Sequence, residues 1–142
     1  MRKKIHLLFF IAILLPAMVY SQASSNKKFN SIISTIKGDL NKDKLPDSVI
    51  VLQDTSDNYA PYRLQLFFKD ANTGYRLVIQ NESAIEVEFP NGKEGMLTGT
   101  KFSHISIKAG VLTINTELLR GYYAYKFRYQ NGYFALIRFK QC

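Results

Sequence analysis

The residues best suited to chemistry lie in one short stretch, Gly-Asp-Leu-Asn-Lys-Asp-Lys-Leu-Pro-Asp, which runs from Gly38 to Asp47. Oxygen-bearing side chains stand at loop positions 1, 3, 5 and 9, and position 7 can offer its backbone carbonyl: Asp39, Asn41, Asp43, Asp47 and Leu45. Calcium binds about six to eight oxygen atoms at roughly 2.3–2.6 Å, and alternate residues of a tight loop can surround one ion. We therefore predict a Ca²⁺ site made of these five residues.

This loop differs from an EF-hand loop at two positions. Lys44 replaces the glycine of the sharp turn, and Ile50 stands where the bidentate glutamate would be. The three carboxylates would repel one another without a cation, which favours a metal. The alternative is an acidic surface turn whose Asp and Asn side chains accept hydrogen bonds from their own backbone.

The stretch from Gly38 to Val51 resembles the Gly-Asp-Leu-Asn-Gly-Asp-Gly-x-x-Asp-hydrophobic motif of FG-GAP/VCBS-type repeats. In integrin-like propellers that motif binds calcium in a β-hairpin loop, so the resemblance implies the same role for the five residues above. The motif occurs once here, and one blade cannot make a propeller. The order of elements is also similar to that of small secreted bacterial proteins with one such motif, an all-β body and an aromatic C-terminal hairpin. That wider resemblance implies no established activity.

Period-two alternation of apolar and polar residues dominates the rest of the chain, which predicts strands rather than helices. Residues 62–69 alternate in this way, and 75–80 return as the next strand after a turn. Residues 48–53 contain a continuous apolar run, which is typical of a strand buried on both faces. We predict an all-β fold, an antiparallel sheet or meander of about seven or eight strands in a sandwich or open barrel. Residues 29–35 fit either a strand or a short helix.

Two hairpins can be predicted with their register. A two-residue loop at Ala109-Gly110 pairs Ile107 with Leu112 and Ile105 with Ile114. Asn131-Gly132 is a strong hairpin signal, because both central residues must take positive φ angles. This second turn places Tyr129 opposite Phe134 and Phe127 opposite Leu136.

Residues 81–101 show the weakest pattern. We predict one short strand, Ile85–Phe89, followed by a long loop. Loops of this length are usually functional or disordered. An alternative function is therefore an enzyme or enzyme inhibitor with its site in the 89–100 loop.

The first 21 residues have the three regions of a cleaved signal peptide: a basic start, an apolar run from Leu7 to Leu15 and a polar end. Cleavage is expected before Gln22, or alternatively before Ser24. Nine apolar residues are too few for a spanning helix, which needs about 20. The sequence thus predicts a signal peptide (1–21), a flexible tail (22–28) and a single β domain (29–142). No cysteine lies near the cleavage site, so we expect a secreted or periplasmic protein without a lipoprotein anchor.

Catalytic motifs are not found. The predicted mature chain has one histidine, His104, and the sole cysteine is the terminal Cys142. A lone histidine in a strand is more often structural than catalytic, and we predict that the protein is not an enzyme. The role that best fits is a calcium-stabilised binding or interaction module; a purely structural envelope protein is a third reading.

The mature chain is mildly basic, with 16 basic and 11 acidic residues from position 22 onward. From Lys101 onward the sequence has seven basic residues and one acidic residue, Glu117, and aromatic residues are frequent. Basic residues interleaved with aromatic residues can bind nucleic acid, but an exported protein rarely encounters nucleic acid. We expect an unknown protein or glycan of the cell envelope as partner and no nucleic acid, and the oligomeric state stays open. Alternatively, the aromatics fill the core while Lys126 and Arg128 solvate the outer face.

Overall fold

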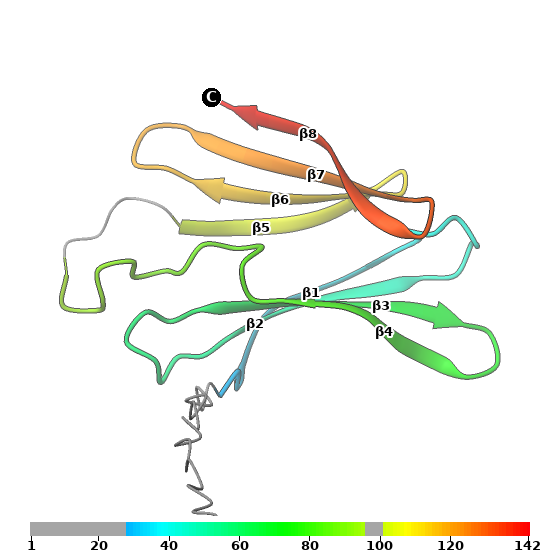
Figure 1. Ribbon diagram of the computed structural model, residues 1–142, viewed down its shortest axis with the longest axis horizontal. Helices are drawn as coiled ribbons and strands as arrows, with labels where there is room; N and C mark the ends of the chain where they lie inside the picture. Colours follow the sequence, from blue (N-terminus) through cyan, green and yellow to red (C-terminus); the bar gives the residue numbers. More distant parts are fainter. Residues whose placement is uncertain (1–27, 96–100) are drawn as a thin grey trace, which may run out of the picture.

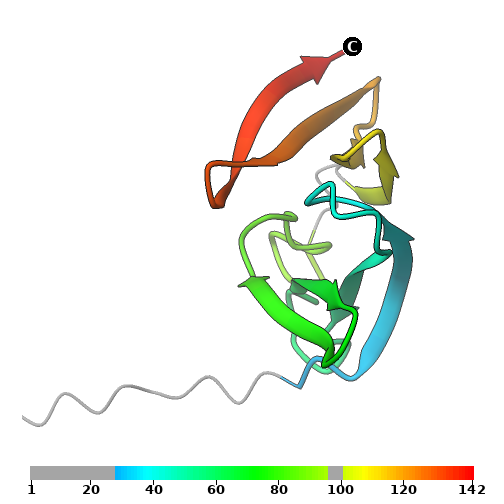
Figure 2. The same cartoon turned by 90° about the vertical axis from the view of Figure 1, so that its right-hand side faces the viewer.

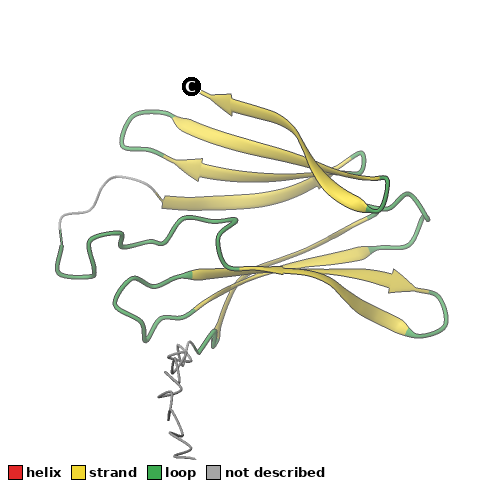
Figure 3. Ribbon diagram, viewed as in Figure 1, coloured by secondary structure: helices red, strands yellow, loops and turns green. Residues whose placement is uncertain are grey.

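The computed structural model describes residues 28–95 and 101–142 (Figure 1). These residues form two four-stranded antiparallel sheets, and they contain no helix (Figure 3). The first sheet consists of β1 (Ser31–Gly38), β2 (Asp47–Gln53), β3 (Tyr62–Asp70) and β4 (Gly74–Asn81). The second sheet consists of β5 (Lys101–Lys108), β6 (Val111–Glu117), β7 (Tyr122–Gln130) and β8 (Tyr133–Gln141). The prediction of an antiparallel all-β fold is confirmed, and the sheets stay open instead of closing into a barrel.

Both predicted hairpins have the expected register. Ile107 pairs with Leu112 and Ile105 with Ile114 in the β5–β6 hairpin. In the β7–β8 hairpin, Tyr129 pairs with Phe134 and Phe127 with Leu136. The two central residues of each turn have positive φ angles: Ala109 (51°) and Gly110 (73°), Asn131 (54°) and Gly132 (85°). Turn chemistry therefore fixed the register in both cases.

The two sheets face each other across an apolar core. Val49 and Val51 of β2, Leu66 of β3 and Ile114 of β6 are at most 1% exposed. Ile50 and Leu52 point away from the second sheet and are only half-buried. The apolar run at 48–53 is thus not a strand buried on both faces, because no second layer covers the outer side.

The sheets approach each other along one side only. Contact between them is concentrated at β1 and β5, and from there β4 and β8 diverge (Figure 2). At the near side a Cβ on Gly38 would lie 2.6 Å from Ile107 Cγ2, so only glycine allows this approach. The result is a wedge-shaped space between the sheets that opens toward β4 and β8.

The connection from β4 to β5 crosses from one sheet to the other. Its described part, residues 82–95, contains no strand, so the predicted strand Ile85–Phe89 is wrong. No strand in the described residues pairs with this segment. Side chains hold it, together with one backbone hydrogen bond from the Phe89 amide to the Tyr59 carbonyl (3.2 Å). Ile85 is 4% exposed in the core, and Glu88 accepts hydrogen bonds from Gln53 Nε2 (2.6 Å) and the Tyr62 hydroxyl (3.3 Å). Residues 29–35, where a short helix was the alternative, lead into and form most of β1.

Candidate functional site

The loop between β1 and β2 carries the residues predicted to bind calcium. Lys42 and Lys44 have φ angles of 66° and 70°, which residues with a Cβ rarely adopt. Both positions are glycine in the calcium motif that the sequence resembles. The backbone therefore has the left-handed conformation that those glycines permit, although lysine occupies both places.

Amide groups surround two of the carboxylates. The backbone amides of Lys42 and Lys44 donate to the two oxygens of Asp39 at 2.7 and 2.9 Å. Asp43 accepts from the amide of Leu45 and from Asn41 Nδ2, each at 2.8 Å, and its own amide donates to Asn41 Oδ1 at 3.1 Å. These donors offset part of the repulsion between the carboxylates without a cation.

Asp47 has a different environment from the other acids of the loop. Its side chain is 0% exposed. One carboxylate oxygen accepts from the amides of Leu40 (2.8 Å) and Asn41 (3.4 Å), and the other from the amide of Lys69 on β3 (3.0 Å). Asp47 thus connects the start of the loop to the first sheet.

The donor chemistry of the loop suits a hard cation. A carboxylate oxygen has two lone pairs. Each oxygen of Asp39 and Asp43 that accepts one hydrogen bond therefore keeps a second lone pair that can bind a metal. A cation would share Asp47 with three backbone amides, and Leu45 lies half-buried in the same loop. Nowhere in the described residues are three or more His, Cys, Asp or Glu side chains already gathered as a metal site. Calcium would therefore depend on Asn41 and the Leu45 carbonyl as well as on the carboxylates.

The loop lies at the side where the two sheets meet. Leu40 is fully buried in the core. The β5–β6 turn packs on the loop, since a Cβ on Gly110 would lie 3.7 Å from the Asp39 carbonyl oxygen. Ordering this loop therefore orders the junction between the sheets.

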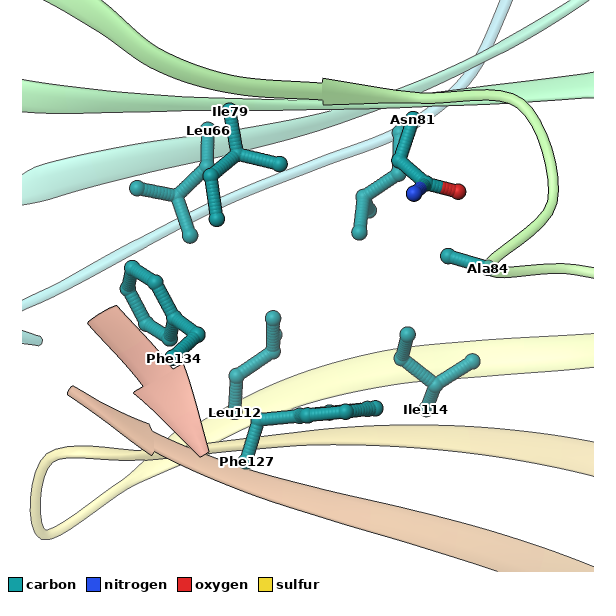
Figure 4. A pocket seen from close by; sticks show the side chains of 9 residues that line it. Leu66, Ile79, Asn81, Ala84, Leu112, Ile114, Phe127 and Phe134 are labelled. Atoms are coloured by element: carbon teal, nitrogen blue, oxygen red, sulfur yellow. The ribbon is translucent and has the colours of Figure 1, made fainter. Parts of the chain in front are cut away.

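A cleft at the open side of the wedge is the second candidate site. A hollow of about 190 Å³ lies between the sheets. Leu66 and Ile79 enter it from the first sheet, and Leu112, Phe127 and Phe134 from the second (Figure 4). Of the described residues that line it, only Asn81 has a polar side chain.

A second hollow of about 260 Å³ continues the cleft along β7. The two share Ala84 and Phe127, and the second has more polar groups at its wall, including Glu86, Thr116 and Tyr123. Tyr123 is 8% exposed, and its hydroxyl lies beside Thr116 and Glu86 but makes no hydrogen bond of ordinary geometry in the described part of the chain. Burial raises the pKa of Tyr123 to about 12, and the nearby carboxylate of Glu86 contributes to the rise. The cleft thus combines an apolar floor with one unsatisfied buried hydroxyl.

Apart from Tyr122, the aromatic residues of β7 lie on the face opposite to its basic residues. Tyr123, Tyr125, Phe127 and Tyr129 alternate toward the first sheet and are buried or half-buried. Lys126 and Arg128 point outward and line a shallow basic surface with Lys108 and Arg138. Lys140 Nζ lies 5.5 Å from the centre of the Tyr122 ring, and Tyr122 is 37% exposed. The interleaving seen in the sequence is therefore separated by the strand period of two.

His104 takes part in a polar network at the surface. Asn115 Nδ2 lies 3.1 Å from His104 Nε2, and His104 Nδ1 lies 3.0 Å from Ser103 Oγ. Ser103 also donates to Glu117 Oε1 at 3.1 Å. These four side chains thus form one exposed polar network that joins β5 to β6.

The 89–100 loop, the alternative site, is described as far as residue 95. Its first half packs on the turn after β2, where Lys93 Nζ donates to the Thr55 carbonyl at 2.7 Å and the Lys93 amide to Asn58 Oδ1 at 3.2 Å. Residues 96–100 lie outside the described residues. The predicted signal peptide and almost all of the 22–28 tail lie outside them as well.

Comparison with protein-family models, curated proteins and solved structures finds no match to this chain. Within the described residues no helix is long and apolar enough to cross a membrane. Functional inference therefore depends on the loop and the cleft themselves.

Sequence reasoning located the loop but missed the cleft. The lining residues come from β3, β4, β6, β7, β8 and the connecting segment, so no local spacing brings them together. One signal was available: the aromatic residues at odd positions from 123 to 129 share one strand face.

Proposed function

We propose that this chain is an exported, calcium-stabilised binding module whose binding site is the cleft between its two sheets. The observation that carries the proposal is the cleft: two adjoining hollows lined mainly by apolar and aromatic side chains, open at the β4–β8 side. Ligand sites are typically concave and apolar, with few polar groups. Side chains that pack tightly in an ordinary core leave no such space.

The exposed residues beside the cleft support this proposal. Leu136 and Phe139 on the same face of β8 are 53% and 50% exposed. They extend the apolar surface from the cleft to the edge of the second sheet. The basic outer face of that sheet further suits a location at an anionic protein or glycan of the cell envelope.

Binding can be tested with a neutral apolar dye, N-phenyl-1-naphthylamine, whose fluorescence rises in apolar surroundings. We expect the purified mature protein to bind the dye. Ala84→Trp should abolish binding, because Ala84 lines both hollows and the larger side chain would fill them. Ala135→Trp is the matched control. Ala135 lies on β8 and pairs with Arg128 of β7, whose side chain points outward, away from the cleft. Equal dye binding by both variants would contradict a site in the cleft.

Calcium has a structural role in this proposal. Asp39, Asn41, Asp43, the Leu45 carbonyl and Asp47 would hold the ion, which would supply positive charge to the loop at the sheet junction. We expect a Kd of about 10⁻⁴–10⁻³ M, as in extracellular modules. Calcium should bind in preference to Mg²⁺, which demands stricter octahedral geometry.

The calcium role predicts a change in melting temperature. Millimolar calcium should raise the melting temperature by several degrees relative to chelator, because a ligand of the native state stabilises it by mass action. Asp43→Ala should remove the difference without unfolding the protein, whereas Asp70→Ala, in the β3–β4 turn, should keep it. Equal melting temperatures for the wild type with calcium and with chelator would exclude calcium but leave the cleft proposal standing.

A further inference from the structure

The buried hydroxyl of Tyr123 shows what kind of molecule fits the cleft. A buried polar group without a partner costs about 1–3 kcal/mol, so native proteins rarely leave one. This hydroxyl belongs to a side chain that lines the second hollow. Thr116 and Glu86 lie beside it, but it makes no hydrogen bond of ordinary geometry among the described residues. A ligand that hydrogen-bonds to it would satisfy the group.

Charge restricts the ligand further. Glu86 lines the same hollow as Tyr123. Among the described side chains that line the two hollows there is no lysine, arginine or histidine. A carboxylate or phosphate would therefore meet a negative group with no compensating cation, and desolvation would add to its cost. An uncharged polar group such as a hydroxyl avoids both penalties.

The apolar part of the ligand follows from the first hollow. Its volume of about 190 Å³ exceeds the roughly 150 Å³ of an engineered apolar cavity that binds benzene. Phe127 borders both hollows, and Tyr123 lies four residues away on the same strand, about 13 Å at 3.3 Å per residue. A medium-length hydrocarbon chain matches this distance.

We propose that the cleft holds a neutral amphiphile, with its hydrocarbon body between the sheets and an uncharged hydroxyl at Tyr123. This inference rests on the proposed function, since it specifies the ligand class of the same cleft. It separates long-chain alcohols and related neutral lipids from fatty acids, although their hydrocarbon parts are identical.

The experiment measures displacement of N-phenyl-1-naphthylamine by 1-decanol and by decanoate at neutral pH. We expect 1-decanol to displace the dye at concentrations at least about tenfold lower than decanoate. Tyr123→Phe should raise the concentration of 1-decanol required by about fivefold, the effect of one hydrogen bond, while dye affinity stays within about twofold. Tyr125→Phe is the matched control and should change neither, because Tyr125 lines the same hollow and is not among the groups left unpaired.

Glu86→Gln provides a second, independent variant on an exposed residue. This variant should reduce severalfold the ratio of the decanoate concentration to the 1-decanol concentration needed to displace the dye, because it removes the negative charge of Glu86 from the cleft. If decanoate competes as well as 1-decanol in the wild type, or if Tyr123→Phe leaves 1-decanol displacement unchanged, the ligand class is wrong. Dye binding that Ala84→Trp abolishes would then still support the cleft as the binding site. A wild type that binds no dye would overturn both proposals.

Discussion

At the scale of single residues, Asp39, Asp43 and Asp47 have unequal roles although they belong to one motif. Asp39 and Asp43 are bonded within their own loop. Asp47 accepts from three backbone amides, one of them on β3, and has no exposed surface. The cost of losing a buried charged acceptor includes the desolvation of every donor that it leaves behind.

We expect Asp47→Ala to destabilise the protein by about 3 kcal/mol in the presence of chelator. Each hydrogen bond to a charged group contributes about 1.5–3 kcal/mol, and water would replace part of what is lost. Asp43→Ala should cost about 1 kcal/mol or less under the same conditions, because its carboxylate is exposed. Urea unfolding with chelator measures both values free of any metal effect. Similar losses for the two variants would contradict the distinct role of Asp47.

Tyr62 and Tyr123 predict a loss of stability at alkaline pH. Burial raises the pKa of Tyr62 above its ordinary value, with Glu88 adding to the effect, and burial raises the pKa of Tyr123 to about 12. Both groups bind their protons more tightly in the folded state than in the unfolded state. Their contribution is therefore complete below the unfolded value of 10 and falls as pH rises from there toward 12.

Phenolate absorbance and urea unfolding between pH 9 and 12 test this dependence. Tyr123→Phe should flatten the fall in unfolding free energy above pH 10, and one late-titrating phenol should disappear from the absorbance curve. Tyr133→Phe, at an exposed position of β8, is the control and should leave the slope as in the wild type. A Tyr123→Phe protein as sensitive to alkali as the wild type would show that the hydroxyl is not desolvated.

At the scale of elements, the β1–β2 loop has its backbone conformation without the residues that favour it. Left-handed backbone costs a residue with a Cβ about 1–2 kcal/mol, and Lys42 and Lys44 both adopt it. The amides of both lysines donate to Asp39, which keeps them in this conformation. Hydrogen bonds within the loop therefore offset its strain.

Lys44→Gly should stabilise the protein by about 0.5 kcal/mol, because relief of the left-handed strain exceeds the entropy that glycine adds to the unfolded chain, about 0.4–1 kcal/mol. The same change should tighten calcium binding. Lys37 lies within β1, where the backbone is extended. Lys37→Gly should therefore destabilise the protein by about 0.5–1 kcal/mol. Thermal unfolding of the two variants checks the sign, and a stabilising Lys37→Gly would contradict the explanation.

The elements also show what a sequence can and cannot predict. The β5–β6 and β7–β8 hairpins were predictable in register because two residues in each turn dictate the pairing. The segment at Ile85–Phe89 alternates like a strand, yet it lies between the sheets with no strand beside it, which local pattern does not reveal. The β1–β2 loop was singled out as a candidate calcium site from the spacing of its oxygens. The cleft was not, because it depends on the angle at which the two sheets meet.

At the scale of the whole molecule, the two sheets are joined where Gly38 lies against Ile107. A Cβ at position 38 would overlap the Ile107 side chain at 2.6 and 3.0 Å. These contacts lie next to the β1–β2 loop and opposite the open side of the cleft. The close approach of β1 to β5 therefore sets how far apart the sheets are at the cleft.

Gly38→Ala should destabilise the protein by about 1–3 kcal/mol, the usual cost of overpacking. Ile107→Ala removes the overlapping atoms at its own cavity cost of about 2–5 kcal/mol. We expect the double variant to be more stable than the sum of the two losses predicts, by at least about 1 kcal/mol. Additive losses in urea unfolding would show that the two side chains do not set the approach.

The strand order described above has a consequence for how the chain folds. Every ladder in both sheets joins strands that are consecutive in sequence. Loop-closure entropy grows with the length of chain enclosed, so a meander of neighbours forms faster than a sandwich whose strands cross between layers. All partners of the first sheet are present once the chain reaches Asn81, and the second sheet likewise needs nothing before Lys101. The contact of Gly38 with Ile107 joins positions far apart in sequence, so it encloses a longer stretch of chain than any hairpin within a sheet. We therefore expect this contact, which brings the two sheets together around the cleft, to form later than the hairpins.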